Sequence, residues 1–340
     1  NVSQLWLKRY FYFLIAIALI QIPVVIYQFS IIKWIDPDRM SGTFGWGQTG
    51  NLGIYFLTIF ALLAARMAEI GRIRIRYIVF IALLSIPPVL GEVKLYFLFL
   101  PIIAAFLIRN EFYRRPGLGV GLAAFAVILI VSVDYIVVVT QGWQAGRNPL
   151  SFVQQIPEMF NREIELAETV GRYSRADRLV NSINFTRRNV KTILFGEGPG
   201  AITTISVFPD HSPKTAQYAN WGLISESAMT FPWLLIEYGY VGVALFFYLL
   251  WLIYRRGTVL RSSPDQELRI YGRFLEASVF IYFTGIFYGS VVQVDSTSTT
   301  FWTTAALIVS LSYKYESEKS RTIKTEMAEA KPSSSNTAIV

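Results

Sequence analysis

Cysteine is absent from this chain of 340 residues, and histidine occurs once, at His211. The lack of cysteine excludes disulfides and thiolate metal sites. No cluster with metal-ligand spacing is present, and no glycine-rich loop ends in Gly-Lys-Ser/Thr, so neither a metal, a cofactor nor a P-loop nucleotide site is expected. Charge is also scarce, because Asp, Glu, Lys and Arg make up only 16% of the chain. That is too little to cover a soluble domain of this size.

Apolar sequence is abundant, with 53% hydrophobic and 15% aromatic residues. This composition predicts an all-α, multi-pass integral membrane helix bundle. About eight apolar segments are visible, at 10–32, 49–65, 77–90, 95–108, 117–140, 231–254, 274–294 and 301–313. The chain begins with Asn1 and shows no signal-peptide pattern, so we expect further material, and further spans, before it.

The basic residues lie at the ends of the apolar segments, which indicates an orientation. The connections 66–76, 109–115 and 255–273 carry four, three and five Lys or Arg residues, whereas 33–48, 91–94 and 295–300 carry two, one and none. Because Lys and Arg accumulate on the cytoplasmic side, the second set faces outward. The net charge of +8 is therefore a bias of cytoplasmic loops and does not indicate nucleic-acid binding.

This orientation divides the chain into four parts. Residues 1–140 hold the first five spans, and 141–230 form one large outward-facing loop with amphipathic helices. Residues 231–315 hold the last three spans. The charged and Ser-rich segment 316–340 is expected to be a disordered cytoplasmic tail.

The outward loop carries a repeated arginine pattern. Ser174 and Asp177 form a capping-box pattern that predicts a helix, and Arg172, Arg175 and Arg178 recur every three residues around it. Guanidinium groups bind phosphate in a bidentate manner. This face therefore suits a pyrophosphate or a lipid headgroup, and a solvated helix face is the alternative.

Four further residues are candidates for chemistry, namely Lys94, Arg39, Glu226 and His211. Lys94 and Glu92 lie between two apolar arms, where Lys94 either binds an anionic group or pairs with Glu92 in an exposed turn. Arg39 opens a glycine-rich segment before the second span, where a structural role is the alternative. Glu226 precedes the sixth span, and His211 lies in a turn-rich stretch; either can serve as a general base, although a lone loop histidine is often incidental.

Three glycine-containing segments flank the second span and the polar loop. They read Arg39-Met-Ser-Gly-Thr-Phe-Gly, Phe195-Gly-Glu-Gly-Pro-Gly and Leu235-Ile-Glu-Tyr-Gly-Tyr-Val-Gly. With the large loop between late spans, this layout resembles the bacterial O-antigen polymerase and O-antigen ligase superfamily over about residues 39–254. The resemblance implies a metal-independent glycosyltransferase of the bacterial inner membrane, with the loop periplasmic or extracellular. Its donor would be a glycan carried on undecaprenyl pyrophosphate.

The resemblance also implies roles for individual residues. Arg39, Lys94 and an arginine from the 172–178 group would bind the pyrophosphate. The ligase branch has a histidine just ahead of the span after the large loop, where this chain has Ser225-Glu226-Ser227. This departure favours a polymerase of O-antigen, capsule or exopolysaccharide over a ligase, with Glu226 or His211 activating the acceptor hydroxyl. The expected partners are the lipid-linked oligosaccharide, membrane lipids and other polysaccharide assembly proteins. A lipid-linked glycan flippase and an export-complex scaffold are the alternatives.

Overall fold

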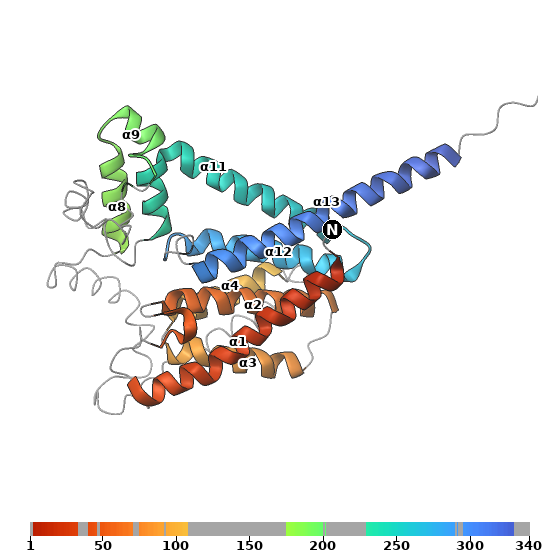
Figure 1. Ribbon diagram of the computed structural model, residues 1–340, viewed down its shortest axis with the longest axis horizontal. Coiled ribbons are helices and arrows are strands. Elements are labelled where there is room, and N and C mark those ends of the chain that lie inside the picture. Colours follow the sequence, from red (N-terminus) through yellow and green to blue (C-terminus); the bar gives the residue numbers. More distant parts are fainter. Residues whose placement is uncertain are drawn as a thin grey trace, which may run out of the picture.

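The structure, a computed structural model, describes residues 3–32, 40–45, 48–70, 75–91, 93–107, 175–199, 201, 229–289, 291 and 295–329 (Figure 1). All secondary structure in these ranges is helical. The elements are α1 (Gln4–Ile32), the short 3₁₀ helix η3 (Gly42–Phe44), α2 (Thr49–Ile70), α3 (Ile75–Leu90), α4 (Lys94–Leu107), α8 (Arg175–Thr186), α9 (Val190–Phe195), α11 (Thr230–Arg261), α12 (Gln266–Gly285) and α13 (Asp295–Glu329).

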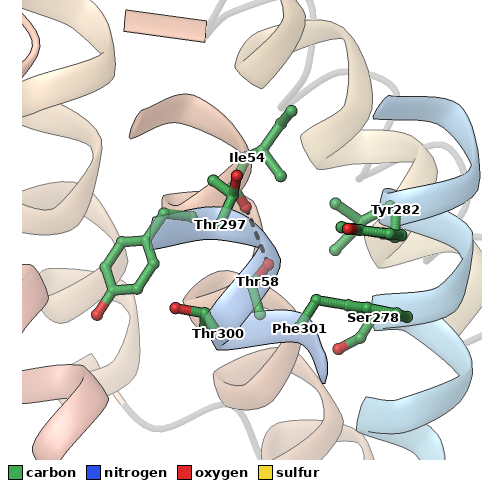
Figure 2. Close-up of a pocket in the computed structure, with 9 residues that line it drawn as sticks. Ile54, Thr58, Ser278, Tyr282, Thr297, Thr300 and Phe301 are labelled. Atoms are coloured by element: carbon green, nitrogen blue, oxygen red, sulfur yellow. Dashed lines mark hydrogen bonds between the residues drawn. The ribbon is translucent and has the colours of Figure 1, made fainter. Parts of the chain in front are cut away.

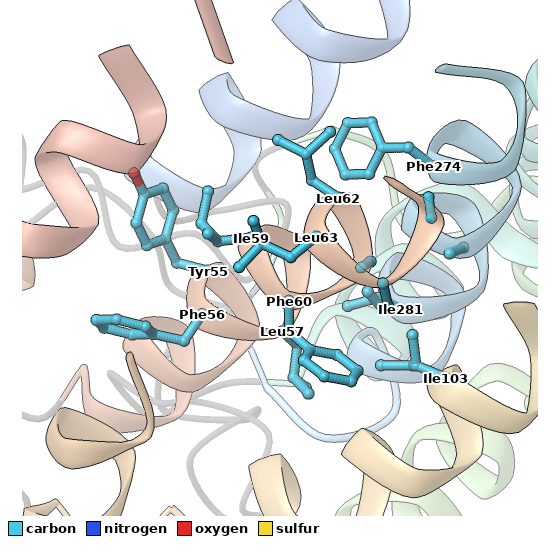
Figure 3. Packing of buried hydrophobic residues seen from close by; sticks show 14 of the residues in the cluster. Tyr55, Phe56, Leu57, Ile59, Phe60, Leu62, Leu63, Ile103, Phe274 and Ile281 are labelled. Atoms are coloured by element: carbon cyan, nitrogen blue, oxygen red, sulfur yellow. The ribbon is translucent and has the colours of Figure 1, made fainter. Parts of the chain in front are cut away.

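Helix α2 is the centre of the bundle. Its residues between Thr49 and Ala65 are almost all buried, on every side of the helix. An α-helix that is apolar all round requires neighbours all round, and α2 contacts α12, α4, α3 and α1. Figure 3 shows its side chains together with Ile103 of α4 and with Phe274 and Ile281 of α12.

Helices α11 and α12 approach each other closely through two glycines. A Cβ atom added at Gly272 would lie 2.5 Å from the carbonyl oxygen of Gly257. Small residues at such crossings allow two backbones to come together in an apolar environment. Gly257 and Gly272 therefore fix where the two helices cross.

Three helical segments are long and apolar enough to cross a membrane, at Gln4–Ile31, Thr49–Ile70 and Thr230–Arg261, and Val79–Leu90 is a shorter apolar helix. Their positions agree with predicted spans. The expectation of an all-helical chain with membrane-length helices is confirmed for the part of the chain that the structure describes.

Three predicted boundaries near the C-terminus are wrong. The span predicted at 274–294 is α12, which begins at Gln266 because the Asp265 carboxylate caps it by accepting the N–H of Glu267 (2.9 Å). The turn predicted at 295–300 is the start of α13, where Thr297 is buried and its hydroxyl donates to the carbonyl of Val291 (3.3 Å). Residues 316–329 of the predicted disordered tail continue α13, which includes a Lys314–Glu318 pair one turn apart.

One end of the bundle is joined by ion pairs, and we call it the ion-pair end. The Glu69 carboxylate of α2 accepts hydrogen bonds from Arg269 (2.9 Å) and Arg273 of α12, and the Arg261 guanidinium of α11 donates to Glu276 (3.0 Å). Further contacts join α1, α2, α11, α12 and α13 at this end: Lys8–Glu267, Arg66–Glu267 and Arg256–Glu316. The predicted gathering of basic residues at one end of the spans is present, and acidic residues partner many of them.

Candidate functional site

The opposite end of the bundle contains a break in α11. Gly239 has φ 65° and ψ −171°, which interrupts the helix and frees carbonyl groups in the turn before it. The loop after α9 satisfies two of them: the N–H of Glu197 donates to the carbonyl of Ile236 (2.8 Å), and the N–H of Gly198 donates to that of Glu237 (3.0 Å). Unpaired backbone groups are costly in an apolar environment, so this loop stabilises the break.

Two glycines make this contact possible. A Cβ atom at Gly196 would lie 2.5 Å from the carbonyl carbon of Glu237, and one at Gly239 would lie 2.5 Å from the carbonyl of Leu194. Both glycines also have positive φ. Only glycine combines such a backbone conformation with so close an approach. Two segments that carried the family resemblance, 195–200 and 235–242, thus meet through their backbones.

Glu237 is a candidate that the sequence reasoning missed. Its side chain is only 1% exposed, at the turn where α11 breaks and where the loop after α9 docks. A buried carboxylate in an apolar helix is expensive and commonly has a function. The signal was available, since Glu237 is the one acidic residue in the apolar run 231–254.

A second anchored segment follows Arg39. The Gln21 side chain of α1 exchanges two hydrogen bonds with Thr43, one with its hydroxyl and one with its N–H, both 2.8 Å. Gln28 makes the same exchange with the backbone of Gly42, at 2.8 and 2.9 Å. These amides lie seven residues apart on one face of α1, and that spacing in an apolar run is the signal by which sequence reasoning could have found them.

The turn before Lys94 touches this anchored segment. A Cβ atom at Gly91 would lie 3.2 Å from the carbonyl oxygen of Met40, and one at Gly53 of α2 would lie 2.3 Å from Val93. Met40, which follows Arg39, therefore lies close to Gly91, which is three residues before Lys94. The structure brings their two segments to the same place.

Backbone hydrogen bonds extend this arrangement to α11. The N–H of Thr230 donates to the carbonyl of Gly289 (2.9 Å), and the N–H of Phe231 donates to that of Ile286 (3.0 Å). A Cβ atom at Gly50 of α2 would lie 3.3 Å from the ring of Tyr288. The start of α2, the end of α12 and the start of α11 thus meet at this end of the bundle.

The predicted site residues stand as follows. Arg178 lies on α8, which packs against α11, and its side chain is partly buried. Arg175 is the first residue of α8 and Lys94 the first of α4, and their side chains are outside what the structure describes. The remaining candidates lie outside the described residues: Arg39, Arg172, His211 and Glu226. Within the described ranges, no three His, Asp or Glu side chains lie together as metal ligands would.

A small cavity lies inside the bundle. It has room for about one water molecule and lies between α2, α12 and α13, where Figure 2 shows Thr58, Thr300 and Ser278 around it. The Ser278 hydroxyl is buried and has no hydrogen-bond partner among the described residues. Arg178, the predicted site residue whose side chain the structure describes, is not among the residues that line this cavity.

No protein-family model, curated protein or solved structure matches this chain. The functional argument therefore depends on this chain's own residues and their arrangement.

Proposed function

We propose that this chain is a membrane glycan polymerase that transfers an undecaprenyl-pyrophosphate-linked oligosaccharide onto another lipid-linked repeat unit. In this proposal about eight segments cross the bacterial inner membrane, the ion-pair end faces the cytoplasm, and the end where α9 meets α11 faces outward. The substrate would be O-antigen, capsule or exopolysaccharide repeat units.

The observation that carries the proposal is the convergence of separate segments at one end of the bundle. Met40 follows Arg39, Gly91 precedes Lys94, and Met229 follows Glu226 by three residues. These neighbours all lie at the end where α2, α11 and α12 meet, and α8 with Arg178 packs on α11 at the same end. In this proposal Arg39, Lys94 and Arg178 gather at this end, where several cations would suit a pyrophosphate, which needs several donors.

The proposed chemistry is a single glycosyl transfer. A hydroxyl oxygen of the acceptor sugar attacks the anomeric carbon of the donor glycan and forms the new glycosidic bond. The bond from that carbon to the pyrophosphate oxygen breaks, and undecaprenyl pyrophosphate leaves with the electron pair. Glu226 or His211 accepts the hydroxyl proton. Arg39, Lys94 and an arginine from the 172–178 group stabilise the charge of the leaving group.

Glycan length in cells tests this proposal. We would compare Arg178→Ala, Lys94→Ala and Glu226→Ala with Arg321→Ala, which changes an exposed residue in the C-terminal part of α13, after confirming that each variant inserts. Loss of polymer with single lipid-linked units accumulating outside is expected for the first three variants only. Single units retained on the cytoplasmic side would indicate a flippase. Full-length polymer that stays unattached to its acceptor would indicate a ligase, and unchanged polymer in all variants would refute the site.

A further inference from the structure

The short helix α9 presents an apolar and basic surface that the bundle does not cover. Its Val190, Leu194 and Phe195 side chains are 71%, 40% and 60% exposed. At 100° per residue these three positions and Lys191 share one face of the helix, while the Thr192 side chain on the other side is buried. Apolar side chains that are exposed next to one another in this way indicate a surface that contacts another molecule or the membrane.

Basic residues border this surface. Arg187 and Arg188 are exposed in the turn before α9, and Lys191 is exposed between Val190 and Leu194. The Arg188 guanidinium lies 4.1 Å from the ring centre of Phe185. Apolar side chains bordered by Lys and Arg are typical of elements that lie in the interface of an anionic membrane.

The depth of α9 follows from its contact with α11. The second half of α11 carries an aromatic cluster, in which Tyr248 stacks on Trp251 (5.6 Å) and the Arg255 guanidinium lies 5.0 Å from the Trp251 ring centre. Such a combination of Trp, Tyr and Arg is typical of a membrane–water boundary. Arg255 lies 16 positions after Gly239 in α11, and at about 1.5 Å per residue this corresponds to about 24 Å along the helix.

This distance places the break in α11 near the other boundary, because the hydrocarbon core of a bilayer is about 30 Å thick. Leu194 lies at the same level, since its carbonyl would be 2.5 Å from a Cβ atom at Gly239. The exposed face of α9 is therefore at the depth where acyl chains meet headgroups. This position selects a lipid as the occupant over a soluble partner.

We propose that α9 is an interfacial anchor that inserts Val190, Leu194 and Phe195 into the outer leaflet. Arg187 and Lys191 bind the phosphate of an anionic phospholipid beside it. The anchor holds the loop after α9 against the break in α11. The inference depends on α11 crossing the membrane and does not depend on glycosyl transfer.

Spin labels can test this, because the chain contains no cysteine. Single variants Leu194→Cys and Phe195→Cys of the full chain would be labelled and reconstituted in phosphatidylglycerol nanodiscs. The aqueous reference is Asn184→Cys, on the exposed part of α8, and the lipid reference is Leu245→Cys, which is 63% exposed in the middle of α11. Oxygen partitions into acyl chains and a nickel chelate stays in water, so their accessibilities report depth.

We expect the ratio of oxygen to nickel accessibility at the two α9 labels to exceed the Asn184→Cys value several-fold and to approach the Leu245→Cys value. In neutral phosphatidylcholine nanodiscs the ratio should fall, and Arg187→Gln with Lys191→Gln should abolish that difference between lipids. Ratios at α9 equal to the aqueous reference would overturn the proposal. So would spin–spin broadening between labels, which would identify a second copy as the occupant. A lipid difference that persists in the double variant would overturn the role of the two cations.

Discussion

Substituting Gly196 by alanine should release α9 from α11. The added Cβ atom would lie 2.5 Å from the Glu237 carbonyl carbon and 2.6 Å from two carbonyl oxygens, all of them backbone atoms that cannot rotate away. The positive φ of 71° costs an alanine about 1–2 kcal/mol. Moving the loop away also breaks the hydrogen bonds from Glu197 and Gly198, at about 1 kcal/mol each. The docked state should therefore lose about 3 kcal/mol, which is about 150-fold in the docking equilibrium.

Alkylation of a buried thiol measures this equilibrium. Thr192 is 3% exposed on the docked side of α9, so the thiol of Thr192→Cys should react only when the helix moves away. In a chain without other cysteines the label reports this one site. We expect the alkylation rate in membranes to rise by about two orders of magnitude when Gly196→Ala is added.

Gly198→Ala is the matched control. Gly198 also has positive φ, at 103°, but a Cβ atom there would meet nothing within 4 Å. This variant carries the backbone strain without the collision and should accelerate alkylation only about tenfold. Equal rates for the two variants would refute the argument that the close approach of Gly196 to α11 holds the loop.

Three further substitutions test other parts of the bundle. Glu69→Gln should destabilise the bundle by about 3 kcal/mol, because it leaves two arginines of α12 without their carboxylate. The control Lys314→Gln breaks an exposed pair on α13 and should cost at most about 0.5 kcal/mol. Thermal unfolding in detergent compares the stabilities of the two variants. Gln21→Leu should shorten the glycan in cells while the protein still inserts into the membrane, because the change removes both hydrogen bonds that hold Thr43. Unchanged glycan length would show that the Gln21–Thr43 contact is not needed for function. Ser278→Ala should change the free energy of unfolding by less than about 1 kcal/mol, because the Ser278 hydroxyl has no partner among the described residues. A large loss of stability would mean that a bound water holds this hydroxyl.

Much of the fold follows from local sequence. Long apolar runs predict α1, α2 and α11, because a helix is the way for one segment to satisfy its own backbone in lipid. The clusters of Arg after the second and sixth spans predict that basic residues gather at one end of the bundle. The capping pattern at Ser174 and Asp177 predicts a helix in this region, and the structure describes α8 from Arg175 to Thr186. The local pattern was misleading at 295–300, because its Ser and Thr residues resemble a turn but lie in α13. The buried Thr297 hydroxyl is paired there with the carbonyl of Val291.

The sequence by itself determined that this chain is helical and apolar. It also determined where basic residues follow the spans and which segments are rich in glycine. It did not determine what those glycines meet. Gly196 and Gly239 lie 43 residues apart in the chain, and only the packing of α9 on α11 shows that each makes room for the backbone of the other segment. The surroundings of Gln21 and of the buried Glu237 also follow only from the tertiary structure. Periodicity shows which residues are apolar, whereas the partner of a polar side chain depends on contacts between segments that are distant in sequence.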